Sequence, residues 1–152
     1  MKKICFVCHG NICRSPLGEF IFKHIVATHH KESEYVIVSR ATSYEEIGND
    51  LYPPIKRVLN KHNIPFTRHY ATRLRNEDYD NYDLFLCMDY YNMRNIKNIF
   101  INDKDKKIHL LGEFVNMNEE VLDPWYSGEF DKVYNQIKNY CELLFVILQE
   151  SL

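Results

Sequence analysis

Residues 3–20 constrain the fold of this chain more than any other stretch. Residues 4–7 are apolar without a break, which is typical of a short strand buried on both faces. A tight stretch with one glycine and one asparagine follows, and Pro16 then stands where the first turn of a helix tolerates proline. Apolar residues recur at helical spacing as far as Ile25. This order of strand, loop and helix predicts a loop whose backbone N–H groups bind an anion.

Two reactive groups stand at the ends of this loop. Cys8 precedes it and Arg14 follows it. A thiol near a helix N-terminus and a cation is favoured as the thiolate, which is its nucleophilic form. The planar guanidinium of Arg14 presents donors that match two phosphoryl oxygens. The loop therefore predicts a phosphate group held directly against a nucleophilic sulfur.

The rest of the chain alternates short apolar strands with helices. Strands are predicted over residues 3–7, 35–39, 84–88 and 107–111. Helices are predicted over 15–30, 51–62, 90–100 and 130–148, with an acidic helical turn over 76–81 and a long loop over 113–125. Continuously apolar strands between helices favour a three-layer α/β/α sandwich around a four-stranded parallel sheet. Ligands bind such folds at the carboxyl ends of the strands, where Cys8, Ser39 and Asp89 stand.

Length and composition narrow the class of protein. A chain of 152 residues with 45% hydrophobic residues suits a single domain over residues 1–152. A net charge of -2 gives no general attraction to nucleic acid or to a membrane, and no apolar run approaches bilayer length. The start, MKKICFVC, is too brief for a secretory signal. The chain has five cysteines, an odd number that fits a reducing compartment better than a disulfide scaffold, so we expect a cytoplasmic protein.

The loop sequence CHGNICRSP resembles the phosphate-binding loop of the low-molecular-weight protein tyrosine phosphatases. The resemblance continues over essentially the whole chain, through VSRATS, LFLCMD and LDPWY. It implies the family's four-stranded fold and hydrolysis of phosphotyrosine through a phosphocysteine intermediate. The expected partners are a phosphotyrosine protein as substrate and phosphate or other oxyanions at the loop. We expect no metal or other cofactor, and a monomer.

The resemblance also assigns the reacting groups. Cys8 is the nucleophile, Arg14 holds phosphoryl oxygens, and Asp123 is the general acid because Pro124 and Tyr126 match the family's DPYY pattern. An Asp-Pro pair by itself is an ordinary turn. Beside the loop, we interpret Asp123 as the group that protonates the leaving phenolate, and we expect it to be buried near the phosphate.

A polar network is expected to support the loop. Asn11 tolerates the left-handed backbone conformation that a tight loop requires, and its amide is placed to bond with Ser39. The family's network of one asparagine, two serines and a histidine maps to Asn11, Ser15, Ser39 and His69. A surface loop position remains an alternative for His69. Ser15 is expected to donate to the Cys8 sulfur.

His9, Gly10, Ile12 and Cys13 complete the predicted phosphate-binding loop. In the family the second cysteine of the loop can form a disulfide with the catalytic one, which protects it from over-oxidation. The resemblance therefore implies a reversible Cys8–Cys13 bond. A small buried side chain is the alternative for Cys13.

The substrate pocket differs from the family pattern. Trp125 replaces a tyrosine and should form an aromatic wall together with Tyr126 and Tyr44. Tyr44 stands one position ahead of the family's aromatic residue, so Glu45 takes that place. The charged residues around the pocket have opposite expected effects on substrate preference. Glu45 disfavours acidic phosphopeptides, whereas His9 and Arg40 favour them. The sequence leaves open which effect is the stronger.

Two other functions would also use a phosphate-binding loop of this kind. An arsenate reductase on the same fold needs a cysteine pair after the third strand, and this chain has only Cys87 within that strand. A phosphotyrosine-binding module would lack the nucleophile or the acid, and both are present. The sequence therefore favours a cysteine phosphatase.

Overall fold

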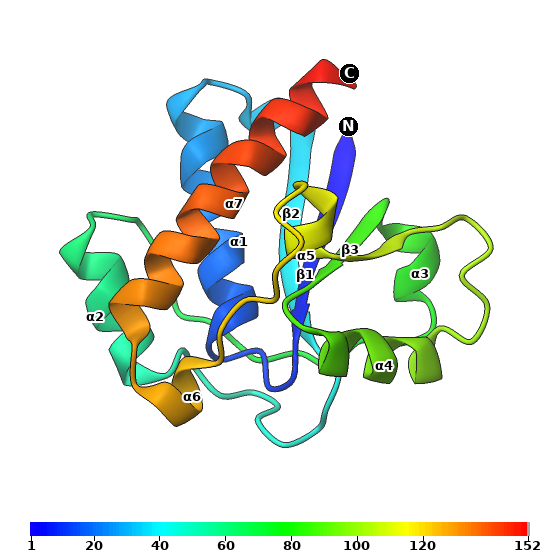
Figure 1. Cartoon of the computed structure of the whole chain (residues 1–152), viewed down its shortest axis with the longest axis horizontal. Coiled ribbons are helices and arrows are strands. Elements are labelled where there is room, and N and C mark those ends of the chain that lie inside the picture. Colours follow the sequence, from blue (N-terminus) through cyan, green and yellow to red (C-terminus); the bar gives the residue numbers. More distant parts are fainter. Residues whose placement is uncertain (152) are drawn as a thin grey trace.

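The computed structural model describes residues 1–151 and is a parallel sheet between two layers of helices (Figure 1). The strands are β1 (Lys2–Cys8), β2 (Tyr35–Ala41), β3 (Leu84–Cys87) and β4 (Ile108–Leu110). They lie in the order β2-β1-β3-β4, and every pair is parallel. The predicted four-stranded sandwich is confirmed.

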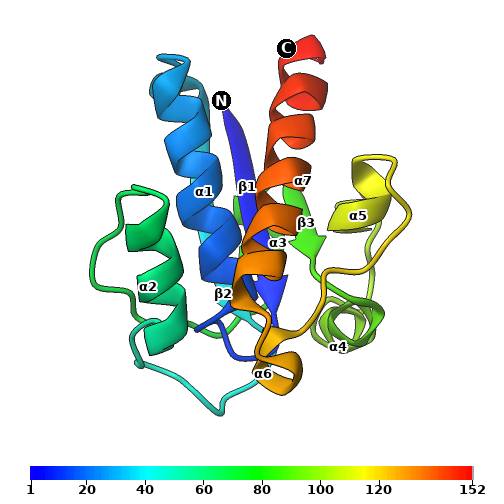
Figure 2. The ribbon, with the colours of Figure 1, turned by 60° about the vertical axis from the view of Figure 1, so that its left-hand side comes forward.

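The helices divide between the two faces of the sheet. One face is covered by α1 (Arg14–Thr28), α2 (Pro53–Lys61), α5 (Leu111–Phe114) and α7 (Phe130–Glu150). The other is covered by α3 (Asp78–Asn81) and α4 (Tyr90–Ile99), and η1 (Glu32–Glu34) is a short turn before β2. Figure 2 shows α1 and α7 side by side, and these two helices pack against each other.

Successive side chains of β1 point to opposite faces of the sheet and so contribute to the apolar core on each face. Phe6 points to the first face, where its ring meets Phe22 of α1 edge-on at 6.0 Å. Cys5 points to the opposite face, where Phe85 packs on Phe100 at 4.9 Å. Fully burying one such large apolar side chain contributes about 1.5–3 kcal/mol. The continuous apolar pattern of the strand is explained by this packing on both sides.

Two short helices that the sequence pattern did not indicate overlap the two ends of the segment predicted as a long loop over 113–125. The first, α5, begins at Leu111 and so ends β4 one residue earlier than predicted. The second is α6 (Pro124–Ser127), whose first turn is capped by the Asp123 side chain. Both are single turns, too short for apolar periodicity to reveal them.

Between these helices the chain returns to the sheet. A Cβ atom on Gly112 would lie 1.7 Å from the carbonyl oxygen of Glu119, so only glycine permits this approach. The backbone N–H of Val121 then donates to the carbonyl of Met88 at 2.8 Å. The segment before Asp123 is thereby held at the carboxyl end of β3. Within residues 1–151 no helix combines the length and apolar character needed to cross a membrane.

Candidate active site

The loop between β1 and α1 encloses the Cys8 sulfur. Cys8 is 3% exposed, and its Sγ lies 2.9 Å from Ser15 Oγ and 3.4 Å from the backbone N of Ser15. Asn11 adopts the predicted left-handed conformation, with φ of 60°. The sulfur thus lies at the N-terminal end of α1, where backbone donors and the helix dipole favour negative charge.

Arg14 lies buried beside the sulfur and is held from three directions. Its Nη1 lies 2.8 Å from Asp89 Oδ2 and donates to the carbonyl of Val121 at 3.0 Å. Its Nη2 lies 3.7 Å from Asp123 Oδ2. Burial alone would lower the pKa of Arg14, but Cys8, Asp89 and Asp123 together raise it above the ordinary value. The guanidinium is therefore charged and fixed in place.

The predicted supporting residues meet at Asn11. Its Nδ2 donates to Ser15 Oγ and to Ser39 Oγ, both at 2.9 Å. His69 Nε2 lies 2.7 Å from the Asn11 carbonyl oxygen and 3.1 Å from Asn11 Oδ1. His69 is buried, unlike the surface histidine that was its alternative, and burial lowers its pKa. The network connects the loop to β2 and to the segment after α2.

This network ends on a carboxylate that the sequence analysis missed. Ser39 Oγ donates to Glu19 Oε1 at 2.6 Å, and Lys23 pairs with the other Glu19 oxygen. Glu19 is 9% exposed. The sequence does contain an indication of a buried carboxylate here. Glu19 is a single acidic residue within the apolar run 17–22 of a helix that packs on the sheet.

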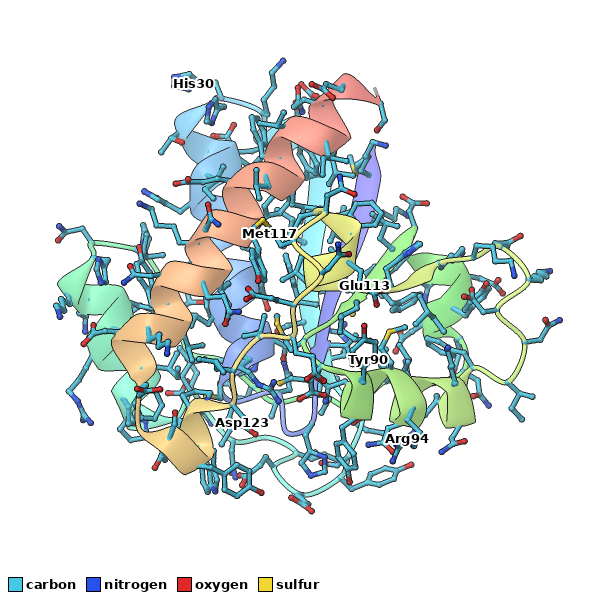
Figure 3. The ribbon with its side chains drawn as sticks, in the orientation of Figure 1. His30, Tyr90, Arg94, Glu113, Met117 and Asp123 are labelled. Atoms are coloured by element: carbon cyan, nitrogen blue, oxygen red, sulfur yellow. The ribbon has the colours of Figure 1, made fainter. Side chains whose placement is uncertain are left out.

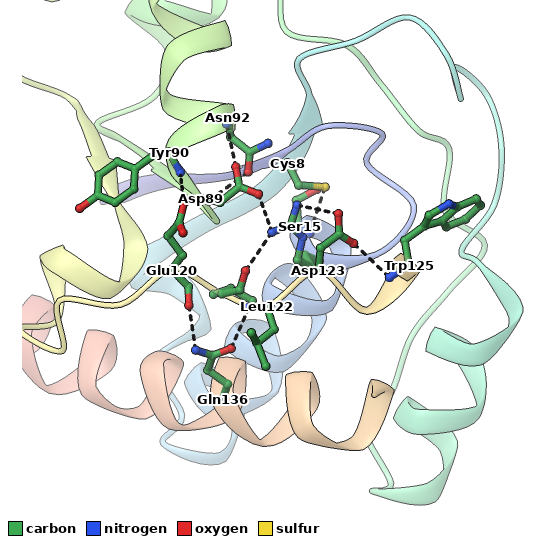
Figure 4. Close-up of polar contacts among 12 residues, drawn as sticks. Cys8, Ser15, Asp89, Tyr90, Asn92, Glu120, Leu122, Asp123, Trp125 and Gln136 are labelled. Carbon is green, nitrogen blue, oxygen red and sulfur yellow. Dashed lines mark hydrogen bonds and ion pairs between the residues drawn. The ribbon is translucent and has the colours of Figure 1, made fainter. Parts of the chain in front are cut away.

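Asp89 is the second missed residue, because it was noted at a strand end but given no role. Its Oδ1 accepts the backbone N–H of Asn92 at 2.8 Å and caps α4, while Oδ2 faces Arg14 (Figure 4). Tyr90 ties α4 to the 113–120 segment, because its N–H donates to Glu120 (Figure 4) and its hydroxyl donates to Glu113 (Figure 3). An Asp followed three residues later by Asn after an apolar strand is a recognisable capping signal.

Asp123 is presented by α6 at the edge of the same site. Its Oδ1 accepts the N–H of Trp125 at 3.0 Å. The expected burial of this carboxyl is only partial, since the side chain is 37% exposed. The reason is that α6 lies on the surface. Gln136 of α7 fixes the segment before Asp123, because its side chain forms hydrogen bonds with both Glu120 and Leu122 (Figure 4).

A cavity of about 640 Å³ opens over these groups. Its floor is the loop with Cys8 and Arg14, and its lining residues are Cys8, His9, Gly10, Asn11, Ile12, Cys13, Arg14, Glu45, Glu46, Asp89, Tyr91, Asp123, Trp125 and Tyr126. Cys13 carries a free, buried thiol whose pKa is raised, chiefly by burial and further by Cys8.

The aromatic wall differs from the prediction at one position. Trp125 and Tyr126 line the cavity, but Tyr44 does not. The guanidinium of Arg73 lies over the Tyr44 ring, 4.4 Å from its centroid, and Arg73 does not line the cavity either, so this contact holds the ring away from it. Tyr91, which the sequence analysis missed, lines the cavity instead, 5.9 Å from the His9 ring.

The fold and these side chains together define the class of cysteine-dependent phosphatases. The family model described as low molecular weight phosphotyrosine protein phosphatase matches residues 3–152, and the chain belongs to this family. It is accordingly a protein tyrosine phosphatase that depends on a cysteine.

Individual relatives agree with this assignment. The low molecular weight phosphotyrosine protein phosphatase of Gallus gallus is 38% identical over 93% of this chain and 92% of its own length. The low molecular weight protein-tyrosine-phosphatase PtpA of Staphylococcus haemolyticus is 36% identical over 100% of this chain and 98% of its own. The crystal structure of YfkJ from Bacillus subtilis superimposes with a TM-score of 0.94, at 30% identity, over 99% of this chain and 96% of that one.

Proposed function

We propose that Cys8 attacks the phosphorus of phosphotyrosine and forms a phosphocysteine. The observation that carries this proposal is the position of Cys8 Sγ on the floor of the cavity, against the buried guanidinium of Arg14 and below the carboxylate of Asp123. As the S–P bond forms, the P–O bond to the tyrosyl oxygen breaks. Asp123 gives its proton to that oxygen, which would otherwise leave as a phenolate with a pKa of about 10.

Water completes the reaction in the second step. Asp123, now a carboxylate, takes a proton from the water that attacks phosphorus, and the S–P bond breaks to release inorganic phosphate and the Cys8 thiolate. Ser15 Oγ, 2.9 Å from the sulfur, donates to that departing thiolate. Arg14 and the loop N–H groups hold the phosphoryl oxygens in both steps, where charge is redistributed.

The supporting residues act by fixing the loop. Asn11 bonds Ser15 and Ser39, and Ser39 is in turn bonded to Glu19. His69 donates to Asn11 from the opposite side. The hydroxyl of Ser15 is thereby left free to direct its own proton to Cys8. We assign Asn11, Ser39, His69 and Glu19 as positioning residues.

The cavity favours an aryl phosphate. A tyrosyl ring above the loop would lie between Tyr91, Trp125 and Tyr126, and Trp125 is braced by Tyr52 at 4.7 Å. A related phosphatase from Entamoeba histolytica, 26% identical with a TM-score of 0.91, was solved with Hepes in the active site. This supports binding of other oxyanions at the loop of this chain as well.

Further parts of the proposal concern the whole protein. Two apolar clusters pack on the two faces of one sheet, which supports a single domain and a monomer. Each cysteine, Cys5, Cys8, Cys13, Cys87 and Cys141, is a free thiol, which supports a reducing, cytoplasmic location. The position of Cys13 in the cavity supports a reversible disulfide with Cys8 under oxidation.

The test is hydrolysis of para-nitrophenyl phosphate in EDTA by the wild type and by Cys8→Ser. We expect turnover by the wild type alone, with inorganic phosphate still bound by the variant in calorimetry. A burst of para-nitrophenol in rapid mixing would reveal the covalent intermediate. Steady turnover by Cys8→Ser would overturn the assignment of the nucleophile.

A further inference from the structure

The charges around the cavity are divided between its floor and its rim. Arg14 is the only Lys or Arg among the described residues that line it, and it lies on the floor in contact with Asp89 and Asp123. At the rim stand Glu45 and Glu46. The phosphate therefore meets positive charge, whereas the part of the substrate outside the phosphotyrosine meets carboxylates.

The segment that carries Glu45 is fixed to the phosphate-binding loop. Thr42 N–H donates to the carbonyl of Cys8 at 3.0 Å. Ser43 donates to the carbonyl of His9 from its backbone at 3.1 Å and from its hydroxyl at 2.9 Å. The Glu45 N–H in turn donates to the Ser43 hydroxyl at 3.4 Å. The backbone thus places the Glu45 segment relative to the phosphate-binding loop.

Glu46 is placed in a similar way. A Cβ atom on Gly10 would lie 3.3 Å from the Glu46 Cγ, so the glycine of the loop makes room for this side chain. Asn49 Nδ2 donates to Glu46 Oε2 at 2.6 Å. Both rim carboxylates therefore have defined positions.

His9 contacts Glu45 directly and holds it at the rim. His9 Nε2 lies 3.0 Å from Glu45 Oε2. An N–H at Nε2 donates to this carboxylate and orients it beside the loop.

Arg40, which the sequence placed as a competing positive charge, is directed elsewhere. Its Nη1 donates to the carbonyl of Ser39 at 2.8 Å, and its Nη2 donates to the Tyr82 hydroxyl at 3.2 Å. It does not line the cavity. The sequence left open whether Glu45 or the pair of His9 and Arg40 dominates the charge beside the phosphotyrosine. Because Arg40 does not face the cavity, the rim is predominantly negative.

We propose that Glu45, held by His9, is a specificity-determining residue that selects phosphotyrosine substrates with Lys or Arg next to the phosphotyrosine. The Glu45 side chain is 69% exposed, so its charge is available to a bound peptide. This proposal rests on the proposed phosphatase function. An exposed ion pair at such a rim changes kcat/KM by up to about fivefold, and replacing the attracted Lys by a repelled Glu widens the difference to about tenfold.

The experiment compares three phosphotyrosine peptides that differ only in the residues flanking phosphotyrosine, which are Lys, Gln or Glu. We measure kcat/KM at low salt for the wild type, Glu45→Gln, Glu45→Lys and Glu32→Gln. Glu32 lies before β2, at the end of the sheet opposite the site. Its replacement by Gln is the matched control, because it removes one negative charge far from the cavity. Circular dichroism checks that each variant is folded.

The wild type and Glu32→Gln should prefer the Lys peptide over the Glu peptide by about five- to tenfold. Glu45→Gln should reduce this ratio by about half or more, and Glu45→Lys should bring it near or below one. Equal rates for the three wild-type reactions, or a ratio unchanged by both Glu45 variants, would overturn the proposal. Failure of the wild type to hydrolyse any peptide or para-nitrophenyl phosphate would overturn the catalytic assignments and the rim proposal with them.

Discussion

Asp89 Oδ2 lies 2.8 Å from Arg14 Nη1, so the residue that caps α4 fixes the guanidinium at the end of the loop between β1 and α1. One carboxylate thereby does two things, because its other oxygen caps α4 through the Asn92 N–H. The orientation of Arg14 depends on a helix from the opposite face of the sheet. Mutations can separate the contact of Asp89 with Arg14 from its capping of α4.

Asp89→Asn is expected to lower kcat/KM for para-nitrophenyl phosphate by about tenfold or more, because an asparagine still caps a helix but no longer holds a charged guanidinium. Asn92→Ala removes the reciprocal capping contact and leaves the Asp89 carboxylate in place. It should cost about 1 kcal/mol in urea unfolding and retain most activity. Equal activity losses in the two variants would show that Asp89 acts only as a cap.

Asp123→Ala is expected to lower kcat for phosphotyrosine by about 100-fold or more. The loss should be smaller for an aryl phosphate whose leaving group departs without a proton. The measurement is kcat for a series of aryl phosphates with leaving groups of rising pKa, compared between wild type and variant. A uniform loss across the series would remove Asp123 as the general acid.

Asn11→Gly and Asn11→Ala separate the backbone role of Asn11 from its side-chain bonds. Both variants lose the amide that bonds Ser15 and Ser39, so both should turn over more slowly than the wild type. Alanine additionally pays about 1–2 kcal/mol for a φ of 60°, which glycine does not. Asn11→Ala should therefore be the less active of the two, and the reverse order would contradict the need for this conformation.

The pH dependence of stability should show the burial of His69. Burial lowers the pKa of His69 in the folded protein below its unfolded value of about 6.5. The unfolded chain then binds the proton more readily, so stability falls as pH drops from about 6.5 through the lower folded pKa. His69→Gln keeps an N–H donor and cannot titrate, so the stability gap between wild type and variant should narrow from pH 7.5 to 5.5. Parallel curves in urea unfolding would contradict this.

The sequence predicted the sheet and the long helices because their apolar patterns are long and continuous. It placed Cys8, Arg14 and Asn11 in one loop because they are neighbours in the chain. It missed the role of Asp89, which depends on a contact between segments 75 residues apart. Such contacts are set by packing and have no local pattern.

Tyr44 shows the other limit of sequence reasoning. Its identity as an aromatic residue beside the pocket suggested a wall, but Arg73, which does not line the cavity, offers a cation to its ring. Whether a side chain points to one side or the other of an irregular loop depends on such a competitor. Tyr91, the second residue of α4, follows the capping Asp89 by two positions and lines the cavity.

The clamp that Gln136 places on Glu120 and Leu122 has a consequence for how activity arises during folding. Cys8 belongs to the first strand, whereas the segment that carries Asp123 is secured by α7, which packs on α1. Contacts between such distant segments form slowly, because closing a long loop costs chain entropy before the contact forms. Because Arg14 is itself held by Val121 and Asp89, the complete site requires these distant segments to be in place. We therefore expect the recovery of phosphotyrosine turnover during refolding to follow the docking of the C-terminal helix onto α1.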